Sequence, residues 1–265
     1  ATFKSPMIYN PYFRSIGLNV AVVPMGVTAE NRETGLGAIF RFTNVMGALI
    51  TMPHKVAVMP MLDEVSTTAQ VAGACNAVLI RTDGTLLGDM FDGEGFVSGM
   101  LAKGRTIAGQ SALVFAPGGV GSAIAASLAK AGPARIALYD VNTAATEALA
   151  GRIVKHYPAT NVMLGSNDPA DHAIVVNASP LGMAAGDPMP VDVGRLQPST
   201  FVGEVVLAQE TTAFLAAAQA RGCSVQIGLD MLFEQIPAYL TFFGLPTTTP
   251  ETLRRLAELS PDARS

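Results

Sequence analysis

The chain has 265 residues, of which 49% are hydrophobic, and it carries a formal net charge of −4. This length suits two α/β domains with separate cores, and no apolar run is long enough to span a bilayer. Only 17 residues are Lys or Arg and they form no basic cluster, so we expect no nucleic-acid or membrane partner. The two cysteines and three histidines lack disulfide and metal-ligand spacing, so we expect no metal and a cytoplasmic location.

The first third of the chain predicts a small α/β unit. In chain order, the pattern is strand-like at 19–27, helical at 33–42, strand-like at 47–52 and helical at 53–72. Strands at 77–81 and 85–89 then flank Thr82-Asp83-Gly84, which is a hairpin signal. A helix from Asp92 to Lys103 would connect this unit to the next one.

The middle of the chain alternates regularly between strands and helices. Strands are predicted at 111–116, 135–140, 161–165, 173–179, 201–206 and 224–228, with helices ending near 131, 156 and 221. Such alternation is typical of a doubly wound parallel sheet with helices on both faces. Two further helices are predicted in the tail, at 231–243 and from Pro250 onward.

A glycine-rich turn between the first strand and helix of this alternation predicts a dinucleotide site. The turn reads Ala116-Pro117-Gly118-Gly119-Val120-Gly121. Glycines let the backbone approach a pyrophosphate, and the helix N-terminus supplies N–H donors. Asp140 ends the second strand at about the spacing expected for an acid that binds the adenosine ribose. As an alternative, Asp140 could simply cap the following helix.

Six segments, taken together, resemble the shikimate dehydrogenase family over nearly the whole chain. They are KSP at 4–6, TMPHK at 51–55, GACNAV at 73–78, GDMFDG at 88–93, NASPLGM at 177–183, and GLDML at 228–232 followed by Gln235. The resemblance implies a substrate-binding domain at 1–92 and 229–265, with the C-terminal helices returning to it. It also implies a Rossmann-like NAD(P)-binding domain at 93–228.

The resemblance also implies roles for individual residues. The catalytic pair would be Lys55 and Asp92. Substrate would be bound by Ser5, Thr51, Lys55, Asn76, Asp92 and Gln235. The cofactor would be bound by Gly118, Gly119, Val120, Gly121, Asp140, Val141, Asn142, Ser179, Val205, Gly228 and Met231.

Several positions depart from the family pattern. Phe3 and Leu49 stand where the family usually has serine and asparagine, and Leu207 stands where it has tyrosine. Met90-Phe91 replaces the Asn-Thr that precedes the catalytic Asp. The family's strand before the Ser-Pro turn has only Ala1 to Lys4 as its counterpart, which leaves open whether this member is natively short or trimmed. Because polar groups are lost, we expect shikimate itself to be a poor substrate.

The cofactor loop departs from the family in a way that favours NAD over NADP. Many members carry Asn-Arg-Thr after the second strand, and the Arg binds the 2′-phosphate of NADP. Here the segment is Asp140-Val141-Asn142, which places a carboxylate near the ribose hydroxyls. Arg135 and Arg152 are the nearest basic residues in sequence and could restore NADP binding if either folded over the site.

The chemistry needs a proton acceptor beside the reacting hydroxyl and a fixed distance to the nicotinamide. Lys55 could take this role if partial burial or a relay through Asp92 lets it release its proton. Taken alone, Lys55 would be a surface charge and Asp92 a helix cap. Asn76 could end a helix, Gln235 could be an exposed polar residue, and His54 is better explained as a local helix-start residue than as a base.

The predicted function is therefore hydride transfer between a cyclic hydroxy acid related to shikimate and a nicotinamide cofactor. A quinate or amino-analogue dehydrogenase of secondary metabolism stays open as an alternative. So does a catalytically poor dinucleotide-binding sensor or scaffold, although the retained Lys55 and Asp92 argue against it. A tetrahydrofolate-linked dehydrogenase of similar architecture is disfavoured by the substrate-domain motifs. The natural substrate and the oligomeric state stay open, with a homodimer as one option.

Overall fold

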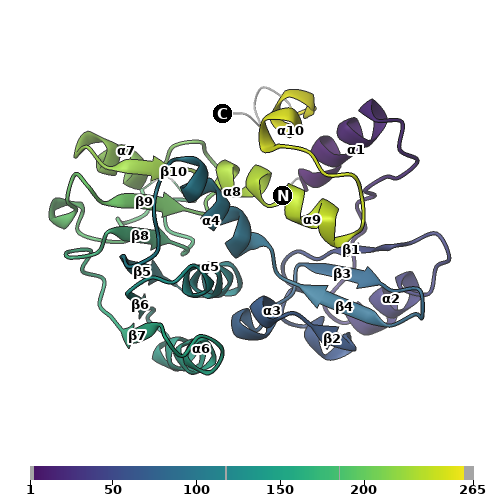
Figure 1. Ribbon diagram of the computed structural model, residues 1–265, viewed down its shortest axis with the longest axis horizontal. Coiled ribbons are helices and arrows are strands. Elements are labelled where there is room, and N and C mark those ends of the chain that lie inside the picture. The colour runs from purple at the N-terminus through teal and green to yellow at the C-terminus, as the bar shows by residue number, and fades with distance from the viewer. Residues whose placement is uncertain (1–2, 117, 185, 260–265) are drawn as a thin grey trace.

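The computed structural model describes residues 3–116, 118–184 and 186–259, and it contains two β-sheets with helices around each (Figure 1). The mixed-sheet domain contains β1 (Gly47–Leu49), β2 (Glu64–Val65), β3 (Ala77–Ile80) and β4 (Leu86–Asp89), with α1 (Ser5–Ser15), α2 (Arg32–Ile39), α3 (Thr67–Ala72), α9 (Ile236–Phe242) and α10 (Pro250–Leu256). The parallel-sheet domain contains β5 (Ser111–Phe115), β6 (Arg135–Tyr139), β7 (Asn161–Leu164), β8 (Ile174–Asn177), β9 (Phe201–Glu204) and β10 (Ser224–Gln226), with α5 (Gly119–Lys130), α6 (Thr143–His156) and α7 (Ala213–Ala220). The helices α4 (Asp92–Ala102) and α8 (Gly228–Glu234) run between the two domains.

All strand pairs in the six-stranded sheet are parallel, and the strand order is β10-β9-β8-β5-β6-β7. The order therefore reverses between β5 and β8, which is the arrangement of a dinucleotide-binding doubly wound fold. Ile124 and Leu128 of α5 are buried on one face of the sheet, and Phe214 and Leu215 of α7 on the other. The α/β prediction with a parallel sheet covered on both faces is confirmed.

The four-stranded sheet has the order β1-β3-β4-β2 and is mixed. The β3–β4 hairpin is confirmed, with Val78 opposite Gly88 in an antiparallel register. A side chain at Gly88 would collide with Leu62, since an added Cβ would lie 2.3 Å from Leu62 Cδ1. This close approach lets the segment that contains β2 pack directly against β4.

The predicted strand at 19–27 does not form. The segment has no regular secondary structure and joins neither sheet among the described residues. The Asn10 side chain holds it instead, because Oδ1 accepts from the Val22 N–H at 2.7 Å and Nδ2 donates to Val22 O at 3.0 Å. The valine-rich sequence gave the strand periodicity, but a strand needs a neighbouring strand to pair with.

The predicted helix at 53–72 is also wrong. The segment contains turns, a short 3₁₀ helix at Met59–Met61, the strand β2 and finally α3. Ser66 begins α3 by accepting a hydrogen bond from the Ala69 N–H, so the helix starts well after Lys55. Lys55 therefore lies in a turn and not in the first turn of a helix.

The predicted helix at 231–243 is two helices, α8 and α9, which meet at Gln235. Pro237 lies in the first turn of α9, where its missing N–H costs no internal hydrogen bond. The prediction that the tail returns to the first domain is confirmed, because Tyr239 and Leu253 share one buried cluster with Ile8 of α1 (Figure 1).

Glycines let α4 pack closely against both α5 and α8. An added Cβ at Gly93 would lie 2.0 Å from Ala123 O, and one at Gly95 would lie 2.6 Å from Gln235 Cβ. Asp230 of α8 also pairs with Lys103 at the end of α4, at 3.1 Å. These contacts hold the two interdomain helices as one unit and fix the position of the α4 N-terminus.

Candidate active site

Lys55, Asn76 and Asp92 converge on one small site. Lys55 Nζ lies 2.5 Å from Asp92 Oδ2, and Asn76 Nδ2 donates to Asp92 Oδ1 at 2.9 Å. The Lys55 and Asp92 side chains are only 13% and 7% exposed. The carboxylate thus receives a separate donor on each oxygen, in a site with little access to water.

Each member of this group is positioned by backbone contacts from a distant segment. The Cys75 N–H donates to Lys55 O at 2.8 Å, which anchors the turn that carries the lysine. Asn76 is fully buried, and its Oδ1 accepts from the Phe91 N–H at 2.9 Å. Asp92 follows as the first residue of α4. The amide of Asn76, directly before β3, therefore ties the start of α4 to the beginning of the β3–β4 hairpin.

The remaining predicted substrate contacts lie on three different elements. Ser5 is buried at the first position of α1, whereas Thr51 is exposed just after β1. Gln235 is buried against Gly95, which is one turn beyond Asp92 in α4. Its Oε1 has no hydrogen-bond partner among the described residues. A buried acceptor without a partner is costly unless a ligand supplies the donor.

The positions that depart from the family pattern divide into two groups. Phe3 and Leu49 are half-buried, and Leu49 packs against the cluster that contains α1 and α9. Met90 and Phe91 are almost fully buried, and the Phe91 ring packs against Tyr239 with centroids 4.7 Å apart. Met90 and Phe91 therefore belong to the protein core, and their loss of polarity is explained by packing.

The described residues of the glycine-rich turn combine a left-handed backbone position with a close approach between helix and strand. Ala116 adopts φ 54°, a left-handed conformation that favours glycine, which accounts for the glycine usually found there. An added Cβ at Gly121 would lie 2.6 Å from Ala116 O, so only glycine lets the helix approach the strand. Nothing lies within 4 Å of an added Cβ at Gly119, so the start of α5 is open. Val120 is half-buried against the core, and Pro117 lies outside the described residues.

Asp140, Val141 and Asn142 follow the end of β6. Asp140 Oδ1 accepts from the Asn142 N–H at 2.8 Å, and Asn142 caps α6. Val141 is 92% exposed. The two arginines nearest in sequence are engaged elsewhere: Arg135 donates to Asp171 O at the opposite end of β6, roughly 16 Å away along the strand. Arg152 donates to Val71 O in α3 at 2.7 Å.

The other predicted cofactor residues lie at the carboxyl ends of β8, β9 and β10. Ser179 Oγ donates to Asn177 Oδ1 at 2.6 Å, and Val205 directly follows β9. Gly228 begins α8 so close to β9 that an added Cβ would lie 2.3 Å from Val206 O. Met231 is 6% exposed and belongs to the main core of the parallel-sheet domain, so it offers little surface.

The sequence reasoning missed Glu204, the last residue of β9. Its side chain is fully buried, Oε2 accepts from the Thr212 hydroxyl at 2.9 Å, and Oε1 has no clear partner. Burial raises the pKa of Glu204 to about 7, while hydrogen bonding from Thr212 and the nearby Asn177 amide partly opposes this rise. A polar residue ending an otherwise apolar strand was the available signal.

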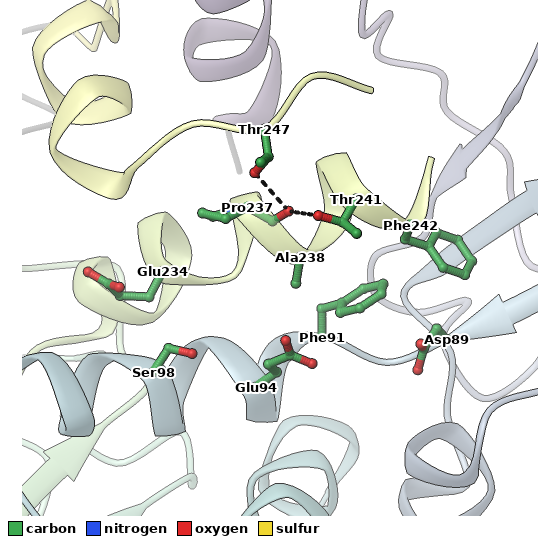
Figure 2. A pocket seen from close by; sticks show the side chains of 10 residues that line it. All are labelled: Asp89, Phe91, Glu94, Ser98, Glu234, Pro237, Ala238, Thr241, Phe242 and Thr247. Carbon is green, nitrogen blue, oxygen red and sulfur yellow. Dashed lines mark hydrogen bonds between the residues drawn. The ribbon is translucent and has the colours of Figure 1, made fainter. Parts of the chain in front are cut away.

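A groove of about 460 Å³ lies between α4 and α9, but it is not this site. Phe91, Glu94 and Ser98 line it from one face of α4, and Glu234 and Ala238 line it from the other side (Figure 2). Neither Lys55 nor Asp92 contributes to it. In the described ranges, no group of three or more His, Cys, Asp or Glu could hold a metal ion, and no helix is long and apolar enough to cross a membrane.

Comparison with known proteins identifies the family. Residues 1–78 match the family model of the shikimate dehydrogenase substrate binding domain. The chain is 32% identical to a shikimate dehydrogenase (NADP(+)) of Acidiphilium cryptum over 256 residues, which cover 95% of this chain and 90% of the relative. The chain belongs to the shikimate dehydrogenase family.

Two solved structures extend this result within the shikimate dehydrogenase family's fold. Quinate dehydrogenase from Corynebacterium glutamicum in complex with NAD is 30% identical, has a TM-score of 0.84, and is matched over 96% of this chain and 93% of its own. The 5-ketofructose reductase of Gluconobacter sp. strain CHM43 is 27% identical, has a TM-score of 0.86, and is matched over 97% and 94%. The prediction of a nicotinamide-dependent oxidoreductase of this family is confirmed.

Proposed function

We propose that the protein transfers hydride between a cyclic hydroxy acid and a nicotinamide cofactor, with NAD preferred, and that Lys55 and Asp92 are its catalytic residues. The observation that carries this proposal is the contact of 2.5 Å between Lys55 Nζ and Asp92 Oδ2, completed by Asn76. Residues 1–92 and 229–265 would bind substrate and residues 93–228 the dinucleotide. A homodimer is compatible with this assignment.

In the reducing direction, Lys55 would donate a proton to the substrate's carbonyl oxygen while the bound nicotinamide supplies the hydride to the carbonyl carbon. The Asp92 carboxylate holds the ammonium group and stabilises its charge. In the oxidising direction, the hydroxyl proton passes to the Lys55–Asp92 pair as hydride leaves the carbon. Asn76 holds Asp92 in place and leaves one carboxylate oxygen for the lysine.

The dinucleotide would lie along the carboxyl ends of the parallel strands, where the strand order reverses. The open start of α5 at Gly119 and the close approach at Gly121 fit a pyrophosphate. Ser179, Val205 and Gly228 surround the opposite half of this edge, where the nicotinamide would be held.

Asp140 supports the preference for NAD. Its carboxylate can accept hydrogen bonds from the ribose hydroxyls, but it would repel a 2′-phosphate by about 4 kcal/mol at 4 Å and a dielectric constant of 20. Solvent at this exposed position reduces that repulsion. A residual repulsion of about 1.4–3 kcal/mol still gives a preference for NAD over NADP of roughly ten- to a hundredfold. Neither Arg135 nor Arg152 is placed to neutralise the phosphate.

The cofactor test is the ratio of kcat/KM values for NAD and NADP with the unmodified enzyme. We expect a ratio of at least about ten in favour of NAD. The shikimate dehydrogenases of Acidiphilium cryptum and Rubrobacter xylanophilus are named as NADP(+) enzymes, and the quinate dehydrogenase was solved with NAD. Equal or better use of NADP would overturn the role of Asp140.

We further propose that shikimate is a poor substrate. Phe3 and Leu49 are half-buried apolar side chains where the family has hydrogen-bonding ones. Two missing hydrogen bonds that together cost about 1.4–4 kcal/mol predict a kcat/KM for shikimate roughly 10- to 1,000-fold below that of a typical family member. A panel of cyclic hydroxy acids that includes shikimate and quinate, assayed by NADH appearance, tests this proposal. Shikimate turnover at the level of an ordinary member would contradict it.

A second candidate function is the reduction of a keto sugar that lacks a carboxylate. The likeness to 5-ketofructose reductase over nearly the full length of both chains favours this function, as do the apolar side chains of Phe3 and Leu49. Consumption of NADH with 5-ketofructose, compared with NADH formation from quinate, separates the two candidates. A sensor or scaffold without catalysis would bind the dinucleotide yet turn over neither probe.

A further inference from the structure

Two tyrosines lie one helical turn beyond predicted substrate contacts, on two different helices. Tyr9 follows Ser5 by four residues in α1, and Tyr239 follows Gln235 by four residues at the start of α9. The Tyr239 N–H donates to Gln235 O at 3.2 Å, so the turn between them is helical. Side chains four residues apart share one helix face. Tyr9 therefore extends the face of Ser5, and Tyr239 extends the face of Gln235.

Both tyrosines belong to the same buried cluster, next to the catalytic segment. Tyr9 is 4% exposed and Tyr239 is 6% exposed. The Tyr239 ring packs against Phe91, the residue directly before Asp92, with ring centroids 4.7 Å apart. The α1 and α9 helices thus form a wall beside the start of α4.

The two phenolic hydroxyls have no hydrogen-bond partner among the described residues. The neighbouring Tyr12 behaves differently, because its hydroxyl donates to Pro246 O at 2.7 Å. A buried tyrosine hydroxyl usually has a partner, since leaving it without one is costly. The fold therefore uses the hydroxyl of Tyr12 but leaves those of Tyr9 and Tyr239 available.

The surroundings of Tyr9 and Tyr239 keep both phenols protonated. Burial raises the pKa of Tyr9. Burial also raises the pKa of Tyr239 well above its usual value, and the nearby Asp92, Tyr9, Cys75 and Asp89 raise it further. A protonated phenol can donate one hydrogen bond and accept others, which suits a hydroxyl or carbonyl oxygen.

We propose that Tyr9 and Tyr239 are specificity-determining residues whose hydroxyls bind the non-reacting oxygen atoms of a polyhydroxylated substrate. This inference rests on the proposed function, because it places the substrate beside Lys55 and Asp92. The two hydroxyls would supply polar contacts to the substrate in place of the polar side chains that the family has at Phe3 and Leu49. The shared chemistry is a ring with several hydroxyl groups, which both a cyclic polyol acid and a keto sugar provide.

The test replaces each phenol by phenylalanine, as Tyr9→Phe, Tyr239→Phe and the double variant, with Tyr12→Phe as the matched control. Tyr12 is also buried in α1, but its hydroxyl is used by the fold. The probes are quinate and 5-ketofructose, each with saturating cofactor. We expect Tyr9→Phe and Tyr239→Phe to raise KM about 5- to 50-fold, with kcat within about threefold and Tm unchanged. Tyr12→Phe should lower Tm and leave KM unchanged.

The same substitutions should have no effect on a substrate analogue that lacks the contacted hydroxyl, because the lost interaction is then absent from both enzymes. Unchanged KM in both single variants, or a fall in Tm like that of Tyr12→Phe without a KM effect, would overturn the inference. If the wild type turns over neither probe, the proposed function fails, and calorimetric binding of the same probes then tests the tyrosines. Equal affinity of the wild type and the double variant for these probes would rule out the proposed role of Tyr9 and Tyr239.

Discussion

The elements predicted from the sequence agree well with the structure in the parallel-sheet domain and poorly in the mixed-sheet domain. In the parallel-sheet domain, every predicted strand forms with bounds close to those expected. In the mixed-sheet domain, the strand at 19–27 does not form, and only the last part of the predicted helix at 53–72 is helical, as α3. A sheet buried on both faces requires continuous apolar strands and periodic helices, and these patterns are local.

The proposed functional residues of the two domains differ in the same way. The dinucleotide would be held by backbone groups at the ends of regular elements, for which glycine spacing is sufficient. Lys55, which we propose as the catalytic lysine, instead lies in an irregular turn, which Cys75 anchors from a distant segment. Irregular segments whose geometry depends on long-range contacts can place a side chain where no regular element would, and functional residues are common in such segments.

The largest expected effect concerns Lys55, which lies in an irregular turn of the mixed-sheet domain. Lys55→Ala should lower kcat by roughly 10²- to 10⁴-fold, the usual scale for a lost acid–base group. Dinucleotide binding, followed by NADH fluorescence, should be unchanged because the two sites use different domains. Asp92→Ala should also reduce activity, with a larger share in substrate affinity.

Lys103→Ala is the matched control, since Lys103 also forms an ion pair but lies at the far end of α4. It should keep nearly full activity. Wild-type turnover by Lys55→Ala would remove the lysine from the mechanism and with it the functional contrast between the domains.

The next effect concerns the buried Glu204 in the parallel-sheet domain. Its pKa rises from 4.5 to about 7 on folding, so the folded state binds the proton more tightly. The free energy of unfolding should therefore fall as pH rises from about 4.5 to 7, by about 3 kcal/mol at about 1.4 kcal/mol for each pH unit. Glu204→Gln cannot titrate and should lose this component.

The measurement is urea unfolding of both proteins at pH 5 and pH 8. The variant should gain stability relative to wild type between the two pH values. As a control, Thr200→Val removes a buried polar group at the opposite end of the same sheet and should not alter the pH dependence. Parallel pH profiles for wild type and Glu204→Gln would refute the assignment.

A smaller effect is expected at the cofactor loop. The double variant Asp140→Asn and Val141→Arg should shift the NAD-to-NADP ratio of kcat/KM toward NADP by roughly ten- to a hundredfold. It removes the repulsive carboxylate and adds a cation at a 92% exposed position. Asp192→Asn is the control, because Asp192 accepts a hydrogen bond from the backbone N–H two residues on, as Asp140 does, and it should leave the ratio unaltered. No shift in the double variant would mean that this loop does not contact the ribose.

The smallest effect probes the segment that was wrongly predicted as a strand. Asn10→Ala removes both hydrogen bonds to the Val22 backbone and should lower the free energy of unfolding by about 1–2 kcal/mol. Asn31→Ala, which removes one exposed contact to Thr28, should change it by less than about 0.5 kcal/mol. Equal effects in chemical denaturation would show that Asn10 does not hold this segment.

Part of the active site could be predicted from the sequence, and part could not. The motifs identified Lys55, Asn76 and Asp92 as individuals, and the structure brings these three together. Ser5 and Gln235 are buried and Thr51 is exposed, and their roles in substrate binding stay predictions. Glu204 was missed although it is a polar residue that ends an otherwise apolar strand, whereas nothing in the sequence shows that the hydroxyls of Tyr9 and Tyr239 lack a partner in the fold.

The sequence by itself determined the parallel sheet, the glycine-rich turn and the acid at Asp140, because each depends on the periodicity or backbone freedom of neighbouring residues. Tertiary structure alone decided that Lys55 meets Asp92 across 37 residues and that Asn76 meets it across 16. It also decided that the phenol of Tyr12 is used by the fold while those of Tyr9 and Tyr239 are left free. Local patterns record which face of an element is buried, but not which distant side chain it will meet there.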